Sequence, residues 1–240
     1  MYFFNKKTIG IMLAIGFANF SNAQTNPKNM SDNTVEQLGI IRTKPGTWNT
    51  YLPIMLHNVK SSRKEKGNIS FTLYQPEDGA EVGIWLERWH NQAAMENHFT
   101  YDYLKAVRKT VPEVKDGAVT QISLKEVAAI PAKTVQLNGV APQRNVIVIF
   151  EPKTEERDAF LKAIADVTPH ARKAPGNYGF NIYEDVANPD RFVLVEGWKD
   201  AAAHDAHMAQ AYSKDFDKAT AGIFKVDPMS ERWLAKDISE

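Results

Sequence analysis

The chain has 240 residues, with 29 Lys and Arg against 29 Asp and Glu, and it contains no cysteine. Nucleic acid is not expected as a partner, because phosphate binding requires an excess of basic residues on one face. Without cysteine the chain has no disulfide, no thiolate nucleophile, no iron–sulfur cluster and no cysteine-ligated zinc.

Residues 1–23 predict a signal peptide. Lys6 and Lys7 give a positive start, an apolar run covers 8–20, and Ser21-Asn22-Ala23 supplies the small residues of a cleavage site before Gln24. The run is shorter than the roughly 20 residues of a membrane-spanning helix. We therefore expect no stable membrane insertion and a periplasmic or secreted protein, with an uncleaved anchor as the alternative. Residues 24–34 are polar and predict a disordered leader.

The chain repeats itself: residues 36–103 recur at 145–212 without a gap. The segment from Arg63 to Tyr74 returns from Arg172 to Tyr183, and Glu87-x-Trp89 returns as Glu196-x-Trp198. Two copies of one module are therefore expected, over 35–128 and 144–240, joined by a linker over 129–143.

The sequence pattern of each module predicts the order βαββαβ. In the first we expect strands over 35–42, 68–74, 82–89 and 118–127, a helix opened by Pro45, and a second helix capped by Asn91. Pro53 is expected to kink the first helix or to confine its start. In the second we expect strands over 144–151, 178–183, 192–198 and 229–235, and helices over 155–172 and 201–221.

This order is that of the α+β, ferredoxin-like class. Within strand 82–89, Val82, Ile84 and Leu86 lie on one face, while Trp85, Glu87 and Trp89 lie on the other. Both faces are largely apolar and need a cover. We expect the module's own helices on one side and the second copy on the other, so that the chain forms an intramolecular pseudo-dimer. Further oligomerisation stays open.

The motif Glu87-x-Trp89, followed by His98, recurs as Glu196-x-Trp198 and His207. With the Arg-x-x-x-Gly sequences at Arg63 and Arg172, it makes the chain resemble the antibiotic biosynthesis monooxygenase family. The resemblance covers nearly all of the mature chain. It implies a dimeric α+β barrel, usually built from two chains, with a pocket between the sheet and the helices of each half.

The resemblance also implies a reaction. A small quinol or phenol loses a proton, and its anion gives an electron to O2 without a metal or flavin. A cofactor-independent monooxygenase acting on a small aromatic substrate is therefore the first hypothesis, and no cofactor is expected. Because the family includes unlike activities, two alternatives stay open: a non-catalytic protein that binds a small ligand, and a haem-binding or haem-degrading protein.

The candidate catalytic residues are two histidines and two carboxylates. His98 and His207 could act as a base or as hydrogen-bond donors, or could be packed against Glu87 and Glu196. Glu87 and Glu196 could take a proton, or could form ion pairs with Arg63, Arg172 or the histidines.

The candidate substrate-binding residues are Trp85, Trp89, Trp198, Asn68 and Asn177. The indoles could wall a pocket or belong to the core. The amides could orient a phenolic oxygen or cap a turn. His204 and His207 have the spacing of a metal-binding pair, but no third ligand is evident, so no metal site is expected. One pocket could have lost its chemistry after fusion, and the sequence does not say which.

Overall fold

The computed structural model describes residues 34–133 and 141–240. The predicted signal peptide, the leader up to residue 33 and linker residues 134–140 lie outside the described residues. Among the residues described, none of the helices is both long and apolar enough to cross a membrane.

Both modules have the predicted order of strands and helices. The first contains β1 (Val35–Arg42), α1 (Trp48–Ser62), β2 (Asn68–Pro76), β3 (Val82–Trp89), α2 (Gln92–His98), α3 (Asp102–Val114) and β4 (Thr120–Glu126). The second contains β5 (Arg144–Phe150), η1 (Thr154–Glu156), α4 (Arg157–Ala171), β6 (Asn177–Asp185), β7 (Phe192–Trp198), α5 (Ala201–Met208), α6 (Ala211–Ala219), η2 (Pro228–Glu231) and β8 (Arg232–Asp237).

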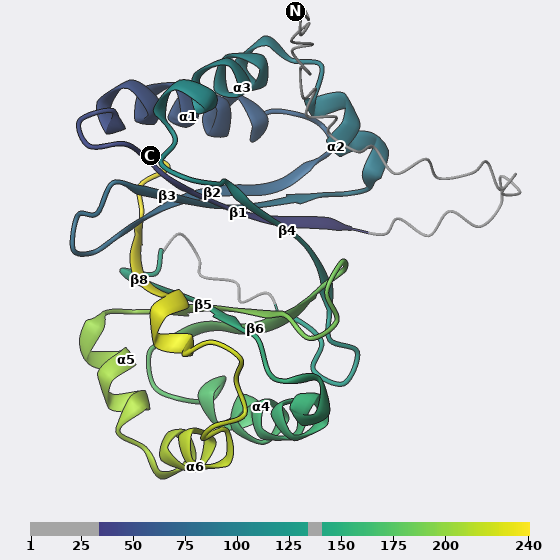
Figure 1. Cartoon of the computed structure of the whole chain (residues 1–240), viewed down its shortest axis with the longest axis vertical. Helices are drawn as coiled ribbons and strands as arrows, with labels where there is room; N and C mark the ends of the chain where they lie inside the picture. Colours follow the sequence, from purple (N-terminus) through teal and green to yellow (C-terminus); the bar gives the residue numbers. More distant parts are fainter. Residues whose placement is uncertain (1–33, 134–140) are drawn as a thin grey trace, which may run out of the picture. The chain divides into compact units, whose positions relative to one another are not determined.

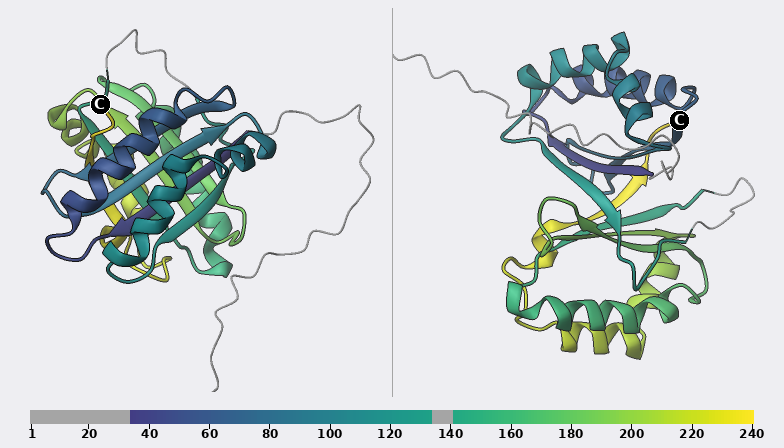
Figure 2. Two further views of the ribbon diagram at one scale, coloured as in Figure 1. Left: turned by 90° about the horizontal axis from the view of Figure 1, so that it is seen from above. Right: turned by 90° about the vertical axis from the view of Figure 1, so that its right-hand side faces the viewer.

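The strands form one closed antiparallel barrel. Its order is β1-β3-β2-β8-β5-β7-β6-β4, so each module contributes four consecutive strands. Two pairings join the modules, β2 with β8 and β4 with β6. Figure 2 shows β4 passing from the first sheet toward the second. The predicted pseudo-dimer within one chain is confirmed.

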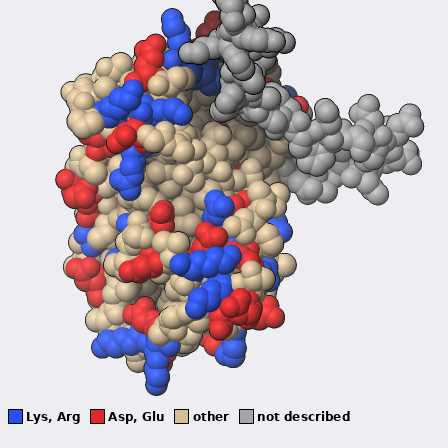
Figure 3. All heavy atoms as spheres, in the orientation of Figure 1, with Lys and Arg blue, Asp and Glu red and all other residues tan. Residues whose placement is uncertain are grey.

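The helices cover the outside of the barrel, with α1 to α3 on one sheet and α4 to α6 on the other (Figure 1). Leu38, Ile84, Ile147 and Val193 belong to one core cluster that both modules share. Each module has a second cluster between its sheet and its helices. Burial of each such side chain stabilises the fold by about 1.5–3 kcal/mol. Lysines, arginines and acidic residues are intermixed on the face drawn in Figure 3.

Strand β3 confirms the prediction that both of its faces are covered. Val82 and Ile84 belong to the shared cluster, whereas Trp85 and Trp89 belong to the cluster under α1 to α3. The alternation of a strand therefore sends Glu87, which lies between the two tryptophans, toward the helices.

The first helix differs from its prediction in two ways. It begins at Trp48, because Pro45 and Gly46 form a turn in which Gly46 has a φ of +79°. Pro53 also lies beyond the first turn of the helix, which continues to Ser62, while the alternative of a kink at Pro53 stays a prediction. Pro53 and Asn49, four residues earlier, are both exposed. Pro53 has no N–H to donate to the carbonyl of Asn49, and this carbonyl lies in an exposed part of the helix where water can bind it. The proline therefore destabilises the helix less than it would in a buried position.

The second helix of each module is two helices, which the sequence analysis missed. Tyr101 and Gln210 have extended backbones and begin α3 and α6. Hydroxyls close the breaks: Thr100 donates to the Asn97 carbonyl at 2.7 Å, and Ser213 donates to the His207 carbonyl at 2.7 Å. Such side-chain bonds compete with the helical ladder and stabilise the turn.

Strand β2 has an irregular start, and the last strand differs from its prediction. Ile69 is exposed whereas Phe71 and Leu73 are buried, because a register shift interrupts β2 between Asn68 and Ser70. A bulge of this kind changes the face to which the preceding residue points. The last strand begins at Arg232, because residues 228–231 form η2 instead.

Candidate functional site

The second module contains a cavity of about 530 Å³ between its sheet and its helices. Its walls are mainly apolar, with Val148, Ile164, Phe180, Leu194 and Phe216 among them. This volume lies in the range of small-molecule sites, which combine apolar walls with a few polar groups.

Glu196 is the buried carboxyl on the wall of this cavity. It lies on β7 two residues before Trp198, so both side chains point toward the helices. The indole Nε1 of Trp198 donates to Glu196 Oε2 at 2.6 Å. Burial raises the pKa of Glu196 to about 7, against the lowering effects of the Trp198 hydrogen bond and of Arg232. The carboxyl can therefore exchange a proton near neutral pH.

His207 lies beside Glu196 in the cavity wall. Its ring is stacked on Trp198 with centroids 4.7 Å apart, and its Nδ1 lies 3.0 Å from the Tyr212 hydroxyl. Burial lowers the pKa of His207 to about 4. The imidazole is therefore neutral at neutral pH, and the tryptophan and the tyrosine fix its orientation.

His204 and Arg232 also belong to the polar lining of the cavity, with the buried hydroxyl residues Ser213 and Thr220. Arg232 Nη2 lies 3.4 Å from His204 Nε2. Burial, followed by the positive charge of Arg232, lowers the pKa of His204 to about 4. Within 34–133 and 141–240, no group of three or more His, Asp or Glu is arranged to hold a metal ion.

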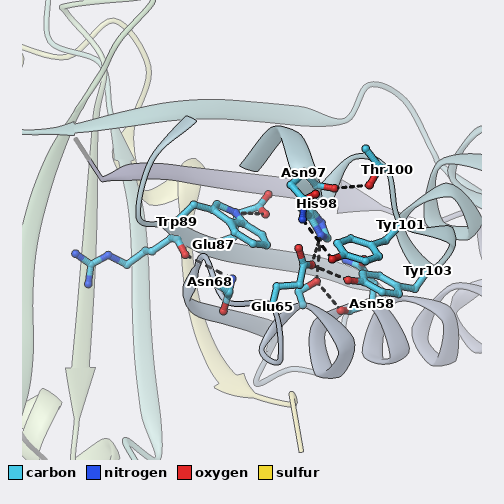
Figure 4. A network of polar contacts seen from close by, with 12 residues as sticks. Asn58, Glu65, Asn68, Glu87, Trp89, Asn97, His98, Thr100, Tyr101 and Tyr103 are labelled. Atoms are coloured by element: carbon cyan, nitrogen blue, oxygen red, sulfur yellow. Dashed lines mark hydrogen bonds and ion pairs between the residues drawn. The ribbon is translucent and has the colours of Figure 1, made fainter. Parts of the chain in front are cut away.

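The first module surrounds His98 with a different network (Figure 4). His98 Nδ1 lies 2.7 Å from Glu65 Oε1, and the Tyr103 hydroxyl donates to the same oxygen at 2.7 Å. The ring of His98 is stacked on Trp89 with centroids 4.7 Å apart. Burial is the main cause that lowers the pKa of His98, and Glu65 opposes it. Ala174 occupies the position of Glu65 in the second module, where tyrosine and histidine are in direct contact.

Glu87 repeats the geometry of Glu196. It accepts from Trp89 Nε1 at 2.9 Å, and burial raises its pKa to about 7. The expected ion pairs with arginine or histidine are wrong for both carboxyls. Arg63 and Arg172 instead donate from Nε to the carbonyls of Phe71 and Phe180, at 2.7 and 3.0 Å. An indole satisfies each carboxyl without adding a charge, which leaves the effect of burial on the pKa dominant.

Trp85 fills the space in the first module that Leu194 borders in the second. Its indole lies over Gly39, where an added β-carbon would be 1.9 Å from the ring. Trp85 is buried and belongs to the cluster under the helices. A substrate contact by Trp85 stays a prediction, and its packing favours the second module as the site.

The other candidates are placed away from the large cavity. Trp89 and Trp198 are 0% exposed and lie behind the histidines that stack on them. Asn68 Nδ2 lies 3.4 Å from the Ser70 carbonyl, and Asn177 Nδ2 lies 3.1 Å from the Gly179 carbonyl. Both amides thus bridge the irregular start of a strand. Their contact with substrate stays a prediction.

Sequence reasoning missed Glu65 and Arg232. Glu65 lies at a position where the two copies differ, because the aligned residue of the second copy is Ala174. A charged residue aligned with an alanine is a signal that sequence reasoning could have used. Arg232 lies in the predicted last strand, beyond the region of clear repeat. No local pattern shows that its side chain reaches the cavity.

Comparisons with known proteins agree with this architecture. The chain matches the model of the "Antibiotic biosynthesis monooxygenase" family twice, over residues 35–110 and 144–219. It is 34% identical over 64 residues to "Putative monooxygenase YcnE" of Bacillus subtilis, covering 27% of this chain and 67% of that protein. It is 26% identical over 84 residues to a Synechocystis protein, sll1783, covering 35% of this chain and 57% of that protein.

Two solved structures share the tandem fold over most of the chain. One, from Fusobacterium nucleatum and also called a "Putative monooxygenase", has a TM-score of 0.74 and 16% identity, covering 87% of this chain and 94% of that chain. The other is an anthrone oxidase-like protein with a TM-score of 0.66 and 14% identity, covering 87% and 92%. At these identities the likeness shows the fold.

Proposed function

Because the chain belongs to the antibiotic biosynthesis monooxygenase family, we propose that it oxidises a small quinol or acidic phenol with O2. The reaction takes place in the cavity of the second module and needs no cofactor. One observation carries the proposal: Glu196, a carboxyl whose pKa is about 7, lies on the wall of a largely apolar cavity of about 530 Å³.

The reaction begins with removal of the phenolic proton. The proton acceptor should be a base whose pKa approaches that of the phenol, which is about 10 for an unperturbed tyrosine. Glu196, with a pKa of about 7, meets this condition better than His207, with a pKa of about 4. We therefore assign the base to Glu196, and we assign to His207 a hydrogen bond that orients the ring.

The ionised substrate then reacts with O2. With a quinol, one oxygen atom replaces a ring hydrogen and the other leaves as water, so the products are a hydroxyquinone and H2O. The quinol supplies all four electrons, and no external reductant is required. Apolar walls formed by Leu194, Phe180 and Phe216 keep water away from the anion.

The test measures oxygen consumption with a panel of quinols and acidic phenols, without added metal, flavin or nicotinamide. Glu196→Gln keeps the size of the side chain and removes the base, so we expect turnover to fall about 10²–10⁴-fold. Glu87→Gln is the matched control in the first module and should change the rate less than about twofold. His207→Ala and His98→Ala, made singly and together, show by the same measurement of oxygen consumption which of the two histidines contributes to turnover.

If the parent protein consumes no O2 with any member of the panel, the proposed oxygenase is wrong. Binding of the same compounds without turnover, measured by calorimetry, would then support the non-catalytic ligand-binding alternative. If Glu87→Gln and Glu196→Gln lower the rate of oxygen consumption equally, the reaction takes place in both modules.

A further inference from the structure

Arg232 differs from most arginines buried in the fold because no carboxylate among the described residues forms an ion pair with it. Arg88, Arg144 and Arg157 donate to carboxylates at distances between 2.6 and 2.9 Å. Arg232 lies in the cavity wall, and among the described residues its one side-chain hydrogen-bond partner is His204 Nε2, at 3.4 Å. Its charge also lowers the pKa of the exposed Asp217 against the effect of burial, but without an ion pair. A half-buried guanidinium without an ion pair is costly unless a ligand supplies one.

His204 does not neutralise this charge. It is buried, and its low pKa keeps it uncharged at neutral pH. If its Nε2 accepts from Arg232, its Nδ1 carries the hydrogen. That Nδ1 is buried and has no hydrogen-bond partner among the described residues. This Nδ1 lies 3.7 Å from Asp205 Oδ1, and Asp205 does not line the cavity, so the wall itself presents the positive charge of Arg232.

Arg232 and Glu196 line the same cavity without touching each other. They form no ion pair, yet the charge of Arg232 lowers the pKa of Glu196 against the effect of burial. Because both side chains line this one cavity, a ligand oxygen bound in it could approach the carboxylate and the guanidinium. The other acidic groups of the lining, Asp217 and Asp227, are exposed.

We propose that Arg232 and Glu196 form an oxyanion subsite that binds an acidic phenol in its ionised form. The inference rests on the proposed function and adds the residue that holds the anion. The phenolic O–H bond breaks as an O–H bond forms on the Glu196 carboxylate, and the negative charge passes to the phenolate. Arg232 then pairs with the phenolate, so the cavity gains one ion pair and no electron is transferred.

The subsite is not duplicated in the first module. Trp233 is paired with Ile147 as Ile122 is paired with Leu38, so Gln121 occupies the position of Arg232. Met95 occupies the position of His204. Neither residue carries a charge. The positive charge that lowers the pKa of Glu87 comes instead from Arg108 on α3, whose guanidinium lies over the ring of Phe99.

The experiment uses 4-nitrophenol, whose phenolate absorbs visible light, as a probe of the ionisation of a bound phenol. The full protein is titrated with the probe at several pH values, and the absorbance gives the pKa of the bound form. We expect the bound pKa to fall by at least about one unit, a tenfold preference for the phenolate. Arg232→Gln should abolish this shift, and Arg232→Lys should retain part of it. Gln121→Ala is the matched control and should leave it unchanged.

A bound probe with an unshifted or raised pKa in the parent overturns the subsite, and so does failure to bind at millimolar concentration. An unchanged shift in a folded Arg232→Gln protein also overturns it, with folding checked by circular dichroism and by the Lys variant. Oxygen consumption separates the two proposals. A shift without O2 uptake refutes the oxygenase and leaves the subsite, whereas O2 uptake without a shift does the reverse.

Discussion

The indole of Trp85 lies over Gly39, its partner across the β1–β3 ladder, so closely that a β-carbon on Gly39 would be 1.9 Å from the ring. The equivalent pair in the second module is Val148 and Leu194, which also face each other across neighbouring strands. Both of these residues line the large cavity. The first module thus pairs a large side chain with a glycine, whereas the second module pairs two side chains of medium size. This difference in packing distinguishes the two halves.

Substitutions at this pair should be strongly coupled. Gly39→Val forces the indole away and should lower the free energy of unfolding by about 1–3 kcal/mol. Trp85→Leu leaves a void and should cost about 2–5 kcal/mol. The double variant recreates the pair of the second module, so its loss should be smaller than the sum by about 0.5–3 kcal/mol. Urea unfolding of the four proteins measures this coupling, and strict additivity would contradict the packing.

Stability should depend on pH through the two buried carboxyls. The pKa of Glu87 and of Glu196 is about 7 in the fold, above the ordinary value of 4.5. Between these values each carboxyl binds more protons in the native state than in the unfolded chain, so its contribution to the free energy of unfolding falls as pH rises from about 4.5 to 7. The buried His204 and His207, with pKa values of about 4, contribute in the opposite direction over part of this range. Each carboxyl should account for a loss on the order of 1–3 kcal/mol.

Glu196→Gln tests this dependence, because a neutral amide can still accept from Trp198 and does not titrate. The free energy of unfolding of the parent, relative to that of this variant, should fall between pH 5 and pH 8 by about the share of one carboxyl, because the histidines contribute equally to both proteins. Chemical denaturation at several pH values gives the slopes. Identical slopes for parent, Glu87→Gln and Glu196→Gln would show that the carboxyls titrate normally.

Activity should depend on pH in the opposite direction. If Glu196 is the base, only its ionised form removes the phenolic proton, so kcat/KM should rise through a pH of about 7. His207, with a pKa of about 4, stays neutral over this range. The pH profile of oxygen uptake measures the rise. A profile that is flat from pH 5 to pH 9 would exclude Glu196 as the base.

Glu65 should be necessary for the stability of the first module. Its Oε1 is within 2.7 Å of both His98 Nδ1 and the Tyr103 hydroxyl. Glu65→Ala leaves these two groups without their acceptor, and we expect a loss of about 1–3 kcal/mol. Tyr103→Phe removes one bond and should cost about 0.5–1.5 kcal/mol. Thermal and urea unfolding measure both, and a cost below about 0.5 kcal/mol for Glu65→Ala would mean that the network contributes little.

The first module should not be stable as a monomer. Residues 34–128 include β3, whose Val82 and Ile84 pack into the cluster shared with the second module. They also include the edges of β2 and β4 that pair with β8 and β6. Exposed strand edges and an apolar face favour association. Sedimentation of this fragment should show a dimer or aggregates, and a soluble folded monomer would be evidence against the shared core.

The sequence alone was sufficient to predict the repeat, the βαββαβ order and the pseudo-dimer. The reason is periodicity: alternation along 82–89 makes both faces apolar, and a strand covered on both sides needs a partner. The bounds of β1 and β3 were also correct. The breaks at Tyr101 and Gln210 were missed, since hydroxyl bonds to backbone carbonyls decide them.

Only the tertiary structure determined which half has the cavity and what lines it. The sequence showed that Leu194 replaces Trp85, but the closeness of Trp85 to Gly39 depends on the register between β1 and β3. The sequence contains Glu65 and Arg232, but it does not show that Glu65 contacts His98 or that Arg232 lines the same cavity as Glu196. These relationships join residues far apart in the chain. Packing brings them together, and the burial that follows sets the pKa of each carboxyl.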